Sequence, residues 1–112
     1  MNKKFDLRLY VLISSVFPVV GYLNQEGLAR FCTEDYAFPS NSNINNHYMH
    51  LTNYSLNKMS PNYKHNEETE EIHDGSKMTM ASLWKLFEKE GHGQDKKEIV
   101  QESIKSLIQD LL

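Results

Sequence analysis

The sequence predicts an α+β fold in which an antiparallel sheet precedes two helices. Near the N-terminus, apolar residues recur at every second position, which is the spacing of a β-strand with one buried face. Near the C-terminus they recur every three or four residues, which is the spacing of an amphipathic helix. At 112 residues the chain has room for one domain or part of one.

The first predicted strand covers residues 5–15, and one of its faces is expected to face the core. The apolar side chains on that face are Phe5, Leu7, Leu9, Val11 and Ile13. Turn-forming residues follow at 14–18, and a second strand is predicted at 19–23. Residues 24–27 end in a glycine and are interpreted as a turn before a third strand at 28–33. Short connections of this kind predict an antiparallel meander.

The middle of the chain is predicted to be mostly loop. Residues 39–46 are rich in Asn and Ser, and residues 49–53 are predicted to form a fourth strand that ends in polar residues. Residues 59–76 contain Pro, Asn, Gly and a Glu-rich run, with almost nothing to bury. We therefore expect a mobile loop over residues 59–76.

Two helices are predicted after this loop. Thr79 or Ser82 is expected to cap the first, which continues through residues 83–90 and stops at Gly91. The second begins at about Asp95 and is strongly amphipathic. Its apolar stripe consists of Ile99, Val100, Ile104, Leu107, Ile108 and Leu111.

Composition and charge narrow the range of functions. The chain has 12 Lys plus Arg against 15 Asp plus Glu, a formal net charge of −3, so overall charge gives no signal for nucleic-acid binding. A single cysteine, Cys32, excludes an intrachain disulfide and favours a reducing compartment. The apolar N-terminal stretch is interrupted by Asp6, Arg8 and Pro18, which argues against a signal peptide or a membrane span. We therefore expect a cytoplasmic protein with no nucleic-acid or membrane partner.

Metal binding is not predicted, although the segment "HYMHLTNYSLNK" at residues 47–58 begins with two histidines. On a strand, His47 and His50 face opposite sides, whereas a zinc site usually has three or four converging ligands. The other candidate ligands are scattered along the sequence, and they are Cys32, His65 and His73. Cys32 also has no base at a recognisable spacing, so it is interpreted as structural.

Hydrogen-bond donors and a cation are concentrated in the same segment, and these groups suit the binding of anions. They are Thr52, Asn53, Ser55, Asn57 and Lys58. Asp6 and Arg8, paired across one pleat, together with Arg30, would add charged groups from two strands. From the residues alone, two interpretations remain open: a pocket for carboxylate and phosphate groups on a sheet face, or a structural strand end.

Four segments in order resemble the tubulin tyrosine ligase-like family, and within it the polyglutamylases. They read "KFDLRLYVLISS", "GLARFCTEDY", "MHLTNYSLNK" and "GSKMTMASLW". The resemblance implies a partial ATP-grasp fold, with residues 1–112 as a central slice of a catalytic domain that is incomplete at both ends. It further implies that ATP activates a glutamate carboxylate on a tubulin tail as an acyl phosphate, which free L-glutamate then attacks.

The family pattern also implies roles for individual residues. It places ATP on Thr52 and Asn53 and the catalytic role on Arg8, with Asp6 holding the Arg8 guanidinium in place. It places the incoming glutamate on Arg30, Tyr54, Ser55 and Lys77. The alternative for Asp6 and Arg8 is a purely structural ion pair. Two cations, Arg30 and Lys77, suit a dicarboxylate, which disfavours glycine or tyrosine as the amino acid that is added.

The resemblance implies magnesium as a cofactor, but its ligands are expected outside this chain. The expected partners are tubulin C-terminal tails on microtubules and free L-glutamate. The expected location is the cytoplasm at the microtubule cytoskeleton, with the cilium or basal body as one such place. The alternative function is a non-catalytic fragment or degenerate relative that acts as a tubulin-binding or anion-binding module.

Overall fold

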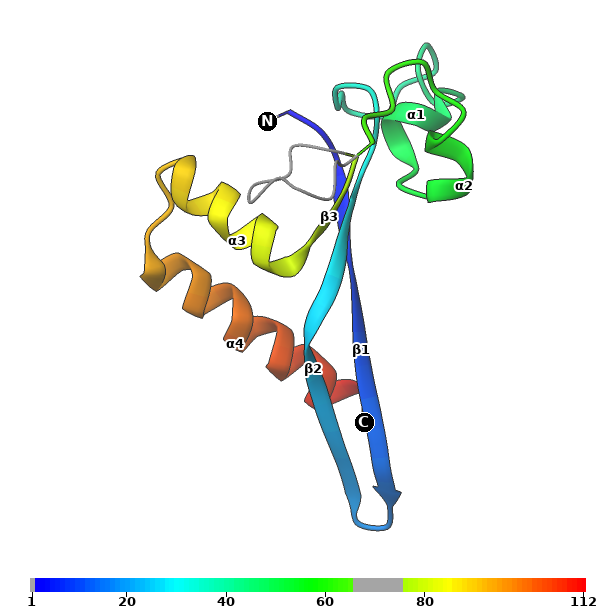
Figure 1. Cartoon of the computed structure of the whole chain (residues 1–112). Helices are drawn as coiled ribbons and strands as arrows, with labels where there is room; N and C mark the ends of the chain where they lie inside the picture. The colour runs from blue at the N-terminus through cyan, green and yellow to red at the C-terminus, as the bar shows by residue number, and fades with distance from the viewer. Residues whose placement is uncertain (1, 66–75) are drawn as a thin grey trace.

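The computed structural model describes residues 2–65 and 76–112, and it has an α+β architecture (Figure 1). In chain order the elements of this part are β1 (Phe5–Val16), β2 (Val19–Phe31), α1 (His47–His50), α2 (Tyr54–Asn57), β3 (Lys77–Thr79), α3 (Met80–Lys89) and α4 (Gln94–Leu111). The sheet is antiparallel in the order β1-β2-β3. The α+β class predicted from the sequence is therefore confirmed.

A long hairpin of β1 and β2 replaces the predicted three-strand meander. The turn predicted at 24–27 is wrong, because β2 runs through these residues. Gly27 lies opposite Leu9 in β1, and a Cβ at Gly27 would lie 2.7 Å from the Arg8 carbonyl oxygen. Glycine is thus required there for close approach of two backbones rather than for a turn. A register shift between Leu9 and Val11 absorbs the extra residues of β2.

The fourth strand predicted at 49–53 is also wrong, because α1 and α2 occupy this part of the chain. Its polar residues satisfy the backbone locally, so no neighbouring strand is needed. The third strand of the sheet is β3, which no prediction included. It pairs with β2 through Leu28–Thr79, Ala29–Met78 and Arg30–Lys77. With only three residues, β3 is too short to display a period of two.

The predicted mobile loop at 59–76 lies largely outside the described residues. The described part, 59–65, forms turns without a helix or strand. Its end is tied to the start of β3, because the Ser76 N–H donates to the Lys64 carbonyl at 3.1 Å. The Phe31 N–H in turn donates to the Ser76 carbonyl at 2.8 Å, which joins this segment to β2.

The core lies between α3 and the β2–β3 end of the sheet. Its buried apolar residues are Ala29, Phe31, Met78, Met80, Leu83 and Leu86, with Leu7, Leu9, Trp84 and Phe87 packed against them. The predicted cap of α3 is confirmed at Thr79, whose hydroxyl oxygen accepts the Ser82 N–H at 3.1 Å. The predicted stop is confirmed too, since Gly91 follows the helix with φ +87°.

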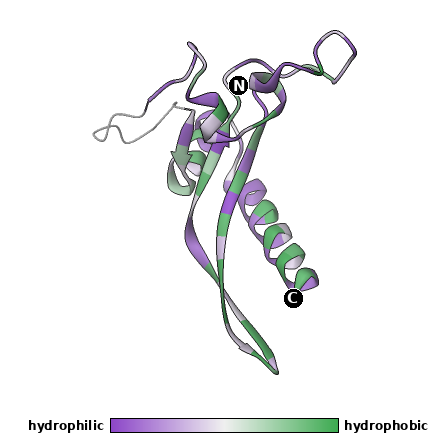
Figure 2. Cartoon of the chain, turned by 90° about the vertical axis from the view of Figure 1, so that its right-hand side faces the viewer, coloured by the Kyte–Doolittle hydropathy of each residue, from purple (hydrophilic) through white to green (hydrophobic). Residues whose placement is uncertain are grey.

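The expectation that the whole alternating face of β1 is buried holds only near its start. Val11 and Ile13 are 37% and 49% exposed, and most of the hairpin beyond Leu9 is solvent-accessible on both faces. Figure 2 shows apolar residues along this part of the hairpin and along α4. The predicted second helix is confirmed as α4, and Leu112 at its end approaches Gly21 of β2. Within the described residues, every helix is too short or too polar to cross a membrane.

Candidate anion-binding site

The sheet carries a row of charged residues on the face opposite its core. Asp6 in β1 pairs with Arg30 in β2, and Arg30 pairs with Lys77 in β3. Register partners project to the same face, so these three side chains lie in one row. The next row, which includes Ala29 and Met78, projects to the other face and packs beneath α3. The core therefore supports the charged row from behind.

Arg30 and Asp6 form a two-pronged ion pair. The Arg30 Nε donates to Asp6 Oδ1 at 2.9 Å, and Arg30 Nη2 donates to Asp6 Oδ2 at 2.5 Å. The hydrogen bond from Arg30 lowers the pKa of the Asp6 carboxyl. Desolvation raises this pKa, but the charge of Arg30 and the neighbouring Thr52 lower it further. The hydrogen bond to Asp6 likewise raises the pKa of Arg30. A guanidinium has more N–H groups than one carboxylate accepts, so Arg30 retains donors for a second anion.

The segment around α2 brings further groups to this row. Thr52 lies near enough to Asp6 to help lower the pKa of the Asp6 carboxyl. Two lysines lie over the Tyr54 ring, with Lys77 Nζ 5.1 Å and Lys58 Nζ 5.6 Å from its centroid. Both ammonium groups are within the range of cation–π attraction. Asp6, Thr52 and Tyr54, together with the two cations of the row, therefore belong to one site.

Asn57 explains why this polar segment folds as it does. Its side chain is 1% exposed and makes four hydrogen bonds. Its Oδ1 accepts from both the N–H and the hydroxyl of Thr33 at 3.1 Å. Its Nδ2 donates to the carbonyls of Leu51 at 2.7 Å and Asn53 at 3.0 Å. Asn57 thus ties the α2 segment to the end of β2 and positions Thr52 and Tyr54.

Three of the predicted site residues do not share these contacts. Arg8 lies on the same sheet face as Asp6 but is exposed, and the predicted pairing of Asp6 with Arg8 is wrong. Cross-strand neighbours on one face are closer than residues two positions apart on one strand, so Asp6 engages Arg30 instead. Asn53 is exposed and its side chain does not cap α2. Ser55 lines a separate groove with His47.

The site contains two residues to which the sequence prediction gave no role in binding ATP or glutamate, although it named Lys58 among the anion-binding groups of its segment. Lys58 follows Tyr54 by four residues, a spacing that places both on one side of a helical turn. That spacing is visible in the sequence. Tyr63 packs edge-on against Tyr54 with ring centroids 5.9 Å apart. Burial raises the pKa of the Tyr63 hydroxyl, and the nearby Tyr54 raises it further. No local sequence pattern indicates the Tyr63 contact.

The described residues do not suit magnesium. Within residues 2–65 and 76–112, no three His, Cys, Asp or Glu side chains come together as a metal-ligand group. Asp6, the carboxylate of the charged row, is engaged by Arg30. Magnesium favours oxygen ligands in octahedral geometry, which these residues do not provide. Neutral donors and cations dominate the site instead, and these groups bind anions.

Comparison with known proteins places the chain in a family. Residues 1–112 match the family model described as "Tubulin-tyrosine ligase family". The chain belongs to this family. The match confirms the resemblance that the four sequence segments indicated, and members of this family provide the comparisons that follow.

Among its tubulin-tyrosine ligase family relatives, the chain is 44% identical over 107 residues to a probable beta-tubulin polyglutamylase of Tetrahymena thermophila, covering 94% of this chain and 9% of that protein. It is 40% identical over 109 residues to tubulin polyglutamylase TTLL11 of Homo sapiens, covering 97% of this chain and 15% of that protein. It is 48% identical over 88 residues to tubulin polyglutamylase TTLL5 of Mus musculus, covering 79% of this chain and 7% of that protein. The chain thus spans a small part of the length of these relatives.

Proposed function

We propose that this chain supplies the amino-acid-binding part of an ATP-dependent tubulin polyglutamylase. The observation that carries the proposal is the placement of Arg30 and Lys77 as cross-strand partners on one sheet face, beside the Tyr54 ring. Free glutamate has two carboxylates, and two cations at neighbouring strand positions suit a ligand with two negative charges. The names of the relatives support tubulin as the protein that is modified.

The proposed reaction joins two glutamates. ATP supplies the phosphoryl group that converts an acceptor glutamate carboxylate on a tubulin tail to an acyl phosphate, with release of ADP. The amine of free glutamate then attacks the acyl carbon and displaces phosphate, and an amide bond forms. The chain's own part is to hold the incoming glutamate through Arg30, Lys77 and Tyr54, while Thr52 and Asn53 hydrogen-bond the nucleotide. Ser55 lines a separate groove with His47, so its predicted contact with glutamate is not part of this proposal.

Arg8 and Asp6 take different parts in this proposal. The exposed Arg8 guanidinium lies on the same face as the charged row and would stabilise negative charge that develops on the transferring phosphoryl group. Asp6 acts as a positioning residue for Arg30, because its carboxylate fixes the guanidinium through two hydrogen bonds. We propose that magnesium, when it is bound, is held by residues outside this chain.

The proposal places the protein with microtubules in the cytoplasm, and the cilium and basal body are the sites at which we would first look for it. Its partners would be glutamate-rich tubulin tails and free L-glutamate. Glycine and tyrosine are the competing amino acids. Neither has a side-chain carboxylate, so neither would use both cations of the row.

The test is incorporation of labelled amino acids into tubulin by the full-length protein that contains this chain. We expect ATP-dependent incorporation of glutamate, with little incorporation of glycine or tyrosine at the same concentration. Preferential incorporation of glycine or tyrosine would overturn the assignment of the amino acid. Retained binding of tubulin tails with no incorporation of any of the three would favour a non-catalytic binding module.

A further inference from the structure

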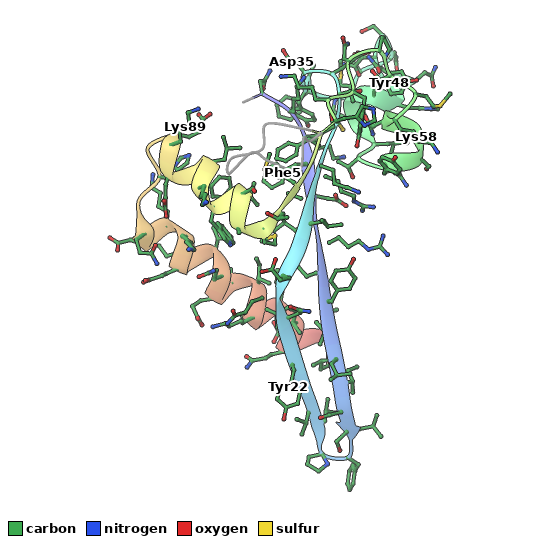
Figure 3. All side chains as sticks on the ribbon, in the orientation of Figure 1. Phe5, Tyr22, Asp35, Tyr48, Lys58 and Lys89 are labelled. Atoms are coloured by element: carbon green, nitrogen blue, oxygen red, sulfur yellow. The ribbon has the colours of Figure 1, made fainter. Side chains whose placement is uncertain are left out.

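A third cation, Lys58, lies over the Tyr54 ring together with Lys77 of the charged row. Lys58 Nζ lies 5.6 Å from the Tyr54 ring centroid, and Lys77 Nζ lies 5.1 Å from it. Figure 3 shows Lys58 next to α2, on the side of the molecule opposite Lys89 of α3. One cation from the sheet and one from the α2 segment therefore contact the same Tyr54 ring.

The position of Lys58 is fixed by the fold rather than by its own side chain. Its N–H donates to the Tyr54 carbonyl at 2.9 Å, which closes the last turn of α2. The preceding residue, Asn57, is buried and is hydrogen-bonded to Thr33 of the β2 end. The backbone that carries Lys58 is thus anchored to the sheet, while the Lys58 side chain is exposed. An exposed cation on an anchored backbone is well placed to meet a second ligand.

Charge at the site contrasts with charge over the whole chain. Among the described residues of the site, Arg30, Lys58 and Lys77 are the cations and Asp6 is the carboxylate, whereas the chain as a whole has a formal net charge of −3. A local excess of positive charge on an acidic chain attracts anionic ligands to that location. Arg30 and Lys77 match the two carboxylates of free glutamate, so the third cation is in excess for the amino acid alone.

We infer that Lys58 binds a carboxylate of the acidic acceptor peptide, next to the residue that is modified. This inference rests on the proposed function and assigns a residue to its second substrate. The chemistry required of the partner is a peptide segment with consecutive or closely spaced glutamates. In this arrangement both binding positions adjoin the Tyr54 ring, with the free amino acid at Lys77 and the peptide at Lys58.

Equilibrium binding of a synthetic glutamate-rich peptide to the full-length protein, measured by fluorescence anisotropy without ATP, tests the inference. Lys58→Met removes the charge and keeps an unbranched stem. We expect it to raise the peptide Kd about two- to fivefold, the range for one exposed ion pair. Lys58→Arg should retain binding, and Lys89→Met, the same change on the far side, should leave the Kd unaltered. Raised salt should diminish the effect of Lys58→Met.

Two outcomes would overturn the inference. One is an equal Kd for Lys58→Met and Lys89→Met. The other is a Kd effect of Lys58→Met that is just as large with a matched glutamine-rich peptide, because that effect would not come from carboxylates. Thermal unfolding of each variant shows whether it is folded, and Lys58→Arg supplies the test if Lys58→Met is not. Failure of the proposed function appears separately, as absence of glutamate incorporation by the unmodified protein.

Discussion

Two regions of the sheet share one sequence pattern but differ in burial. In the proximal sheet, made of residues 5–9, 27–31 and 77–79, Ala29 and Met78 are at most 1% exposed. In the distal hairpin, made of residues 11–23, Leu12 is 66% exposed and Phe17 is 96% exposed. Alternation predicts which side chains share a face, but it does not predict what covers that face. In the proximal sheet, β3 adds a third strand and α3 covers the apolar face.

The proximal sheet also shows how the fold supports the site. The same strands that bury apolar residues under α3 carry Asp6, Arg30 and Lys77 on the opposite face. A packed core restricts the movement of the strands, so the charged row is held at fixed spacing. The distal hairpin lacks this support within the described residues. We therefore expect substitutions in the two regions to differ sharply in their effects.

The largest expected effect is on the core behind the site. Leu83 of α3 is 1% exposed, so Leu83→Ala should lower the free energy of unfolding by about 2–5 kcal/mol. Leu12→Ala makes the same chemical change in the distal hairpin and should cost no more than about 0.5 kcal/mol. Urea unfolding of the 112-residue chain measures both. Equal losses would contradict the contrast between the two regions.

The next effect concerns the link between α2 and the end of β2. Asn57→Ala should destabilise the chain by about 1–3 kcal/mol, because it leaves the Thr33 N–H without its partner in a buried position. Asn45→Ala, at an exposed turn position, is the matched control and should be nearly neutral. Thermal unfolding compares the two variants. A neutral Asn57→Ala would show that the α2 segment is held by other contacts.

The Asp6–Arg30 pair should give a smaller, pH-dependent effect. The pKa of Asp6 is lowered in the folded state, chiefly by the hydrogen bond from Arg30, so the pair stabilises the chain above the unfolded carboxyl pKa of about 3.9. This stability is lost as the pH falls through the lowered folded value. Both side chains are partly exposed, so we expect no more than about 1 kcal/mol.

Urea unfolding at pH 7 and at pH 3 or below measures this contribution. The difference between the unmodified chain and Asp6→Asn should shrink at the lower pH. In an Arg30→Met background, Asp6→Asn should cause little change at either pH, which isolates the pair in a double-mutant cycle. A difference that is the same at both pH values in the unmodified background would mean that Asp6 ionisation does not contribute.

Local patterns predicted some elements well and others not at all. Helical spacing and the Thr79 cap predicted α3 and α4, because these signals are contained within each segment. The short strand β3 and the α1–α2 segment were missed, since three residues show no period and Asn57 is a polar side chain that is buried. Gly27 was assigned to a turn because its close contact with the neighbouring strand cannot be read from the sequence.

The candidate site was predicted from family resemblance more than from spacing. Asp6, Arg30 and Lys77 are distant in sequence and meet only through the strand register. Without that register, Asp6 was assigned to Arg8, its neighbour along the strand. The roles of the site residues in binding ATP and glutamate remain predictions. Lys58 was predicted only as one of several anion-binding groups in its segment. Its contact with Tyr54, and the position of Tyr63 beside the same ring, followed from the packing.

The central claim is that Arg30 and Lys77 bind the two carboxylates of glutamate, and Lys77→Met in the full-length protein tests it most directly. We expect the KM for glutamate to rise roughly tenfold or more, because one charge-assisted contact is lost, while the KM for ATP stays nearly constant. Lys85→Met, an exposed lysine on α3, is the matched control and should change neither constant. A raised KM for ATP with an unchanged KM for glutamate would contradict the claim, because Lys77 would then serve the nucleotide.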